Sequence, residues 1–82
     1  MPLIRHHTIT ARQLWDAVEA QGIKHDHHES DLYLLATPAA CQLVSDYEHA
    51  ENVRSFTSEV DGLRWFDVPF AFMPWWDARS GR

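Results

Sequence analysis

The sequence predicts a small α+β domain in which two helices pack on one face of a three-stranded sheet. Two segments carry apolar residues at helical spacing behind a helix start signal, and three others are rich in the residues that strands prefer. The chain has 82 residues, which is enough for one domain with a thin core. We therefore expect a single domain over residues 1–82, with its core in residues 8–73 and looser order in residues 1–7 and 77–82.

The first expected helix covers residues 11–21. Thr10 and Gln13 have the spacing of a capping box, in which each side chain bonds to the other residue's backbone N–H. Gly22 follows as a natural stop, because glycine readily adopts the left-handed conformation that ends helices. The apolar stripe between these signals consists of Ala11, Leu14, Trp15 and Val18.

The middle of the chain predicts a strand followed by the second helix. Residues 24–30 are polar and are expected to form a loop, whereas residues 31–36 are nearly all apolar, as in a central strand covered on both faces. Thr37 and Pro38 then signal a helix start, since proline costs nothing at the first helical position. Its stripe is expected to end near His49 and consists of Ala40, Leu43, Val44 and Tyr47. A short strand at residues 3–7 is an alternative to the looser order expected there.

The last third of the chain predicts a β-hairpin. Residues 53–60 and 63–70 resemble strands and are separated by Asp61-Gly62, the dipeptide that a two-residue type I′ turn prefers. Such a turn would place Val60 opposite Leu63 and Thr57 opposite Phe66, and would pair Glu59 with Arg64 across the strands. The expected order of elements is α-β-α-β-β, with the hairpin at the C-terminal end.

Charge and cysteine content narrow the classes of function. Twelve Asp and Glu against seven Lys and Arg leave a net charge of −5, so we expect no direct binding of nucleic acid, which requires clustered positive charge. One cysteine forms no internal disulfide, and no apolar segment approaches the length of a membrane span. A soluble cytoplasmic protein without membrane association is the expectation.

No motif indicates catalysis, and the sequence predicts a protein that is not an enzyme. Cys41 is the strongest nucleophile, but it lies beside the apolar stripe of the second helix and is expected to be packed and inert. The histidine-rich loop at residues 25–29 offers an alternative, a site for zinc or another divalent transition metal. Its ligands would be His25, His27, His28 and Glu29, although an extended backbone points His28 away from the other two histidines. No cofactor is expected on the preferred interpretation.

The aromatic residues carry the functional prediction. Seven of the ten lie from Phe56 onward, and strand alternation places Phe56 and Trp65 on one sheet face and Phe66 and Val68 on the other. Two helices cover only one face of the sheet. The other face is expected either to bind a partner or to be covered by the tail that contains Trp75 and Trp76.

A group of acidic residues at the end of the second helix adds to this prediction. Asp46, Glu48 and Glu51 lie where the helix dipole favours cations, and no basic residue is close in sequence before Arg54. An acidic patch for a basic partner would explain them. The residues expected to bind the partner are Trp65, Trp75, Trp76, Phe56, Asp46, Glu48 and Glu51.

The functional prediction is therefore a small non-enzymatic module that binds another protein, as an inhibitor or accessory factor. A homodimer formed through the same aromatic face is a variant of this hypothesis. Phages and mobile elements encode small acidic factors that act against nucleic-acid-binding host proteins. The hypothesis therefore includes an origin of this protein in a phage or mobile element. The alternative is a metal-binding protein that uses the loop from His25 to Glu29.

Overall fold

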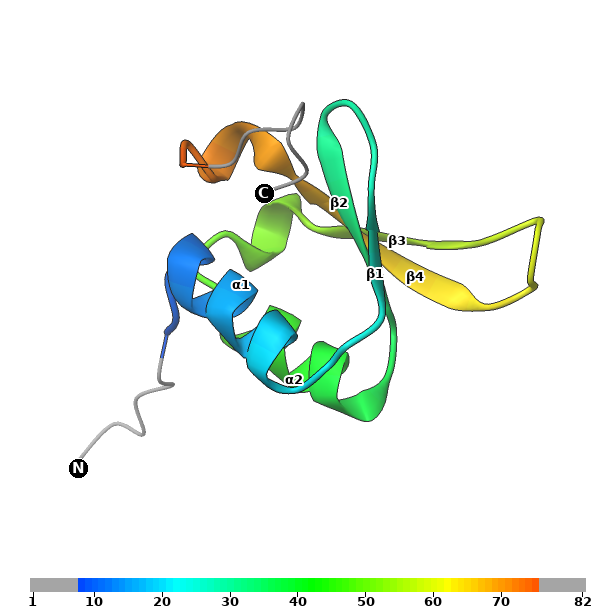
Figure 1. Ribbon diagram of the computed structural model, residues 1–82, viewed down its shortest axis with the longest axis horizontal. Coiled ribbons are helices and arrows are strands. Elements are labelled where there is room, and N and C mark those ends of the chain that lie inside the picture. Colours follow the sequence, from blue (N-terminus) through cyan, green and yellow to red (C-terminus); the bar gives the residue numbers. More distant parts are fainter. Residues whose placement is uncertain (1–7, 76–82) are drawn as a thin grey trace.

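Two helices and a four-stranded antiparallel sheet build the fold in the computed structural model, which describes residues 8–75 (Figure 1). The strands lie side by side in the order β1-β2-β4-β3. Residues 1–7 and 76–82 lie outside the described part, and with them the strand expected at residues 3–7, the looser order expected at both ends, and Trp76. The elements in chain order are α1 (Ala11–Ala20), β1 (His25–His27), β2 (Asp31–Leu35), α2 (Pro38–Asp46), the 3-10 helix η1 (Ala50–Asn52), β3 (Arg54–Thr57), β4 (Arg64–Pro69) and the 3-10 helix η2 (Phe70–Phe72).

Helix α1 confirms the first prediction in detail. The backbone N–H of Gln13 donates to Thr10 Oγ1 at 3.1 Å, and the N–H of Thr10 donates to Gln13 Oε1 at 2.9 Å, so the capping box is complete. Gly22 has a φ of +64°, and the N–H of Ile23 bonds back to the carbonyl of Val18 at 3.0 Å. The predicted apolar stripe is buried.

Helix α2 starts as predicted but ends earlier. Thr37 caps it by accepting from the N–H of Ala40 at 3.2 Å, and Pro38 follows as its first residue. The backbone becomes extended at Tyr47, where a parallel bridge to Ile9 replaces helical hydrogen bonds. The predicted end near His49 was therefore too late, because an interaction with a distant part of the chain ends the helix.

The sheet contains one strand more than predicted, so the predicted three strands and α-β-α-β-β order were wrong in that detail. Residues 25–27 were expected in a loop but form β1, which pairs with residues 32–34 of β2. The three β1 residues are exposed and polar, so the strand has no apolar pattern and depends on backbone pairing at a sheet edge. Strand β2 is central, as predicted, but its two faces differ: Leu32 and Leu34 are buried, and Tyr33 is only partly covered.

The hairpin forms with a different register from the predicted one. Thr57 pairs with Arg64, and a six-residue connection replaces the two-residue turn, so the predicted Glu59–Arg64 pairing was wrong. The connection supplies its own hydrogen-bond acceptors: Ser58 Oγ accepts from the N–H of Val60 at 3.1 Å, and Asp61 Oδ1 accepts from the N–H of Leu63 at 2.9 Å. A register shift of two residues preserves strand alternation, so the predicted faces still hold.

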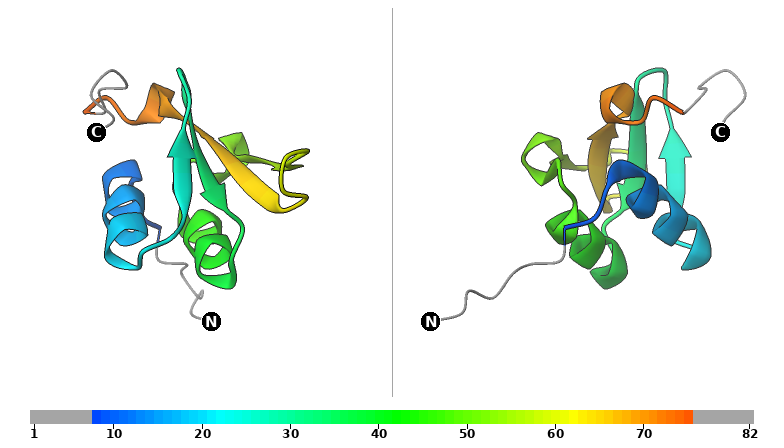
Figure 2. Two further views of the ribbon diagram at one scale, coloured as in Figure 1. Left: turned by 45° about the vertical axis from the view of Figure 1, so that its right-hand side comes forward. Right: turned by 90° about the vertical axis from the view of Figure 1, so that its left-hand side faces the viewer.

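Both helices pack on one side of the sheet, and the β3–β4 hairpin projects away from them (Figures 1 and 2). The core between the layers joins the helical stripes to Leu32, Leu34 and Val68, and Met73 closes it from the C-terminal side at 1% exposure. Cys41 is exposed, so the expectation that it is packed was wrong: the buried positions of α2 are Ala40 and Val44.

Candidate functional site: the open face of the sheet

The sheet face turned away from the core presents two rows of side chains. Strand pairing sets Asp26, Tyr33, Asp67 and Arg54 side by side across all four strands. The neighbouring row contains Leu35, Trp65 and Phe56. No described helix packs on this face, and we refer to it as the open face.

An aromatic cluster occupies the centre of the open face. The rings of Tyr33 and Phe56 lie 5.0 Å apart in an edge-to-face arrangement, although β4 runs between their strands, so the two rings meet across β4. His28 packs on the other side of Tyr33 at 4.7 Å. Trp65 is 8% exposed but does not belong to the helix-side core, so residues of the open face and the hairpin bury it.

A pocket of about 260 Å³ opens beside this cluster. Strands β1, β2, β3 and β4 and the hairpin connection all contribute to it. Its walls therefore combine aromatic rings with two carboxylates that come from different elements, Asp26 of β1 and Asp61 of the connection. The lining residues are Asp26, His28, Tyr33, Phe56, Ser58, Val60, Asp61 and Trp65.

The hairpin tip gives the pocket an apolar and fully accessible edge. Val60 is 96% exposed and Leu63 is 47% exposed, and they are the large apolar residues that the described chain leaves in solvent. Ser58 and Asp61 hold the connection in this shape by accepting backbone hydrogen bonds. Gly62 completes it with a φ of +70°, a conformation that costs glycine little.

Carboxylates set the electrostatics of the open face. Burial, together with a hydrogen bond from its protonated form to Asp31 and repulsion by the Asp31 charge, raises the pKa of Asp67 from 3.8 to about 6; Arg54 and His28 oppose the rise. Oδ1 of Asp67 is buried and has no hydrogen-bond donor within residues 8–75. The neighbouring Asp31 carboxylate supplies none unless one of the two groups is protonated. The pKa of Asp61 is lowered, chiefly by the hydrogen bond from the N–H of Leu63.

The indole N–H of Trp65 is buried beside the pocket. It makes no hydrogen bond of normal geometry within residues 8–75, yet it interacts with the Asp61 carboxylate and helps to lower the pKa of Asp61.

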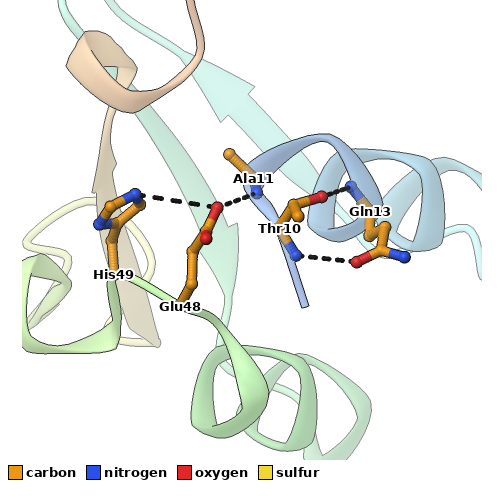
Figure 3. A network of polar contacts seen from close by, with 5 residues as sticks. All are labelled: Thr10, Ala11, Gln13, Glu48 and His49. Atoms are coloured by element: carbon orange, nitrogen blue, oxygen red, sulfur yellow. Dashed lines mark hydrogen bonds and ion pairs between the residues drawn. The ribbon is translucent and has the colours of Figure 1, made fainter. Parts of the chain in front are cut away.

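The acidic group at the end of α2 has a structural partner that the sequence does not show. Glu48 Oε2 accepts from the N–H of Ala11, the first residue of α1, at 3.2 Å, and lies 3.8 Å from His49 Nε2 (Figure 3). The Glu48 charge therefore faces the positive end of α1 and not solvent alone. Asp46 accepts from the side-chain amide of Gln42 at 3.2 and 3.3 Å.

The structure separates the residues expected to bind a partner. Phe56 and Trp65 pair across the hairpin on the open face. Trp75 instead packs against the helix-side core, with the Arg12 guanidinium 5.4 Å from the centre of its ring. Glu51 is exposed in η1, on the segment that follows α2.

The histidine-rich segment divides between two faces, as expected for extended backbone. His25 donates from Nδ1 to the carbonyl of Ile23 at 3.0 Å and meets Trp15 of α1 edge to face at 5.0 Å, whereas His28 packs on Tyr33. Glu29 is exposed in the turn that follows. Among residues 8–75, no three His, Cys, Asp or Glu side chains are grouped so that they would hold a metal ion.

The sequence analysis did not identify four members of the site: Asp26 of β1, Tyr33 of β2, and Val60 and Asp61 of the hairpin connection. The sequence does contain a signal for Tyr33, because a tyrosine with its polar hydroxyl interrupts the run of aliphatic residues in β2. Comparison with known proteins adds no relative: no family, curated protein or solved structure matches the chain. In the described part, no helix has the length and apolar character needed to cross a bilayer.

Proposed function

We propose that the protein is a non-enzymatic binding module whose open face docks a basic segment of a partner protein. One observation carries the proposal: a face that no described helix covers combines three aromatic side chains with a pocket walled by carboxylates. Acting in this way, the module would serve as an inhibitor or an accessory factor of its partner.

The apolar part of the open face supports a protein partner. Aromatic residues are enriched in protein interfaces, because they bury a large area with few rotatable bonds. Val60 adds a side chain that is almost wholly in solvent, at the end of a hairpin that projects from the body of the molecule (Figure 1). A partner that contacts both the pocket and the hairpin tip removes these apolar groups from water.

The charges of the open face support a basic partner. Asp26, Asp31, Asp61 and Asp67 lie on or beside it, and Arg54 is the strand residue that opposes them. The whole chain also carries a net charge of −5. Complementary charge accelerates association and disfavours acidic partners, so binding is expected to weaken as salt is raised.

Site-specific cross-linking tests the proposal. A photo-reactive amino acid is placed at Val60, or at the exposed Glu19 of α1 as a matched control, in cells of the organism that encodes the protein. The proposal expects a cross-linked protein with a basic surface from position 60 only, lost in the Phe56→Ala variant. Equal products from both positions would overturn it, and so would cross-links solely between copies of this chain, which would establish a homodimer instead.

A further inference from the structure

We infer that the pocket of the open face binds the guanidinium group of one arginine side chain, an assignment that rests on the proposed function and names the group the partner inserts. The pocket is defined by its lining, which brings Tyr33, Phe56 and Trp65 together with Asp26 and Asp61. Its size, its aromatic walls and the arrangement of its carboxylates each point to this occupant.

The size of the pocket suits one side chain. The pocket has a volume of about 260 Å³. Sites for drug-sized ligands and cofactors typically occupy about 300–1,000 Å³. A single long side chain that enters from the partner's surface fills the available space without requiring a larger cavity.

The aromatic walls suit a flat cation. Tyr33 and Phe56 meet edge to face, and Phe56 pairs directly opposite Trp65, so the rings line adjoining walls of one pocket. Cations bind over aromatic rings, and arginine does so more often than lysine because its planar guanidinium also stacks. The same contact occurs elsewhere in this chain, where Arg12 lies over the ring of Trp75.

The carboxylates are held in place on separate elements. The N–H of His27 bonds to Asp26 Oδ1 at 2.9 Å, and the N–H of Leu63 bonds to Asp61 Oδ1 at 2.9 Å. These bonds orient the two groups. Asp26 keeps acceptor capacity, since a carboxylate accepts about four hydrogen bonds, whereas Asp61 also interacts with Ser58 and Trp65 and contributes chiefly its charge. A guanidinium presents five N–H donors in a rigid fork and reaches two acceptors at once, whereas an ammonium concentrates its charge at one point.

Trp65 connects the pocket wall to Asp61. Its buried indole N–H makes no hydrogen bond of normal geometry within residues 8–75 but interacts with the Asp61 carboxylate, and Trp65 lines the pocket. The NMR signal of this N–H therefore reports on occupancy of the pocket.

The test is a titration of the full-length protein followed by ¹H–¹⁵N NMR. The probes are Nα-acetyl-arginine methylamide, the lysine analogue, and the citrulline analogue, which keeps the shape of arginine without its charge. We expect arginine to shift the Trp65 indole signal and to bind at least about fivefold more tightly than lysine, with citrulline weaker still. Equal binding of arginine and citrulline, or of arginine and lysine, would overturn the assignment.

Variants separate the pocket from the rest of the surface. Asp61→Asn and Asp26→Asn remove one charge each but keep an oxygen that accepts the same backbone hydrogen bond, so the local fold is retained. Each is expected to weaken arginine binding by about tenfold, the loss of a charge-assisted hydrogen bond. Glu19→Gln, an exposed carboxylate on α1, is expected to change nothing. Equal effects of all three would show that binding follows net charge alone and would overturn the inference.

The outcomes distinguish this inference from the proposed function. If arginine does not bind while cross-linking from position 60 to a basic protein persists and depends on Phe56, the arginine assignment is wrong and the docking face stands. If both are absent, the open face is not a binding surface.

Discussion

Replacing Asp67 with asparagine is expected to stabilise the protein at neutral pH. The carboxyl lies in the middle of the sheet beside Asp31, and its pKa is raised from 3.8 to about 6, chiefly by burial. The fold therefore favours the protonated form. An acid with a raised pKa in the fold contributes stability below its unfolded pKa of 3.8, and that contribution is lost as pH rises to about 6.

The magnitude follows from the size of the shift and the exposure of the group. One pKa unit corresponds to about 1.4 kcal/mol, so the shift from 3.8 to about 6 corresponds to about 3 kcal/mol at full strength. Asp67 is only partly buried, and solvent screening reduces this to about 1 kcal/mol. An asparagine side chain has no charge to desolvate, so Asp67→Asn is expected to raise the free energy of unfolding by about 1 kcal/mol at pH 7.5 and by almost nothing at pH 4.

Urea unfolding of the two proteins across pH 4–8 measures this difference. Carboxylates away from Asp67 are common to both proteins, so their contributions cancel in the comparison, whereas the contribution of Asp31 changes with Asp67 because the two carboxyl groups interact. Asp31→Asn removes the neighbouring charge and is expected to lower the pKa of Asp67, which ¹³C NMR of the Asp67 side-chain carboxyl follows directly. A stability difference between the wild type and Asp67→Asn that is the same at pH 4 and pH 7.5 would refute a raised pKa at Asp67, and so would a variant that is less stable at pH 7.5.

Two further predictions concern contacts that hold the helical layer. Glu48→Gln is expected to lower the free energy of unfolding by about 0.5–1 kcal/mol, because it removes the negative charge at the N-terminus of α1. Glu51→Gln, at an exposed position, is expected to change the free energy of unfolding little. Equal values for the two variants in denaturant unfolding would contradict this role of Glu48. Met73→Ala is expected to lower the free energy of unfolding by about 2–4 kcal/mol, because Met73 is 1% exposed in the core. Leu63→Ala at the hairpin tip is expected to lower it by less than about 0.5 kcal/mol. Similar losses in the two variants would show that Met73 is not a core residue.

Local signals made α1 predictable from the sequence. Its cap, stripe and stop lie within a few residues of one another, and the structure reproduces all three. Strand β1 was not predictable in the same way, because its three polar residues are exposed and its pairing depends on β2. The hairpin register was predicted wrongly for a different reason. The side chains of Ser58 and Asp61 accept backbone hydrogen bonds in a longer connection, which is therefore favoured over the two-residue turn that Asp61-Gly62 prefers.

The candidate site was predictable to the extent that it depends on strand alternation. Phe56 and Trp65 share a face in either register, because a shift by two residues does not change which way a side chain points. Tyr33 joins them only because β2 lies next to β4, a pairing between distant segments. Glu48 was recognised as anomalous, but its partner Ala11 is 37 residues away, so the sequence does not reveal what compensates its charge.

The carboxyl group of Asp67 on the open face is expected to lower the stability of the fold at neutral pH. Asparagine at this position would keep the hydrogen-bonding capacity and avoid the repulsion from Asp31, so the carboxylate is a costly choice for stability alone. Local features that lower stability without compensation tend to occur at functional sites. A basic partner supplies the missing compensation, because a cation near Asp67 favours its ionised form and lowers its pKa. Binding between pH 5 and 6 should then release a proton, which calorimetry detects as a binding enthalpy that depends on the buffer; an enthalpy independent of the buffer would separate Asp67 from the partner's site.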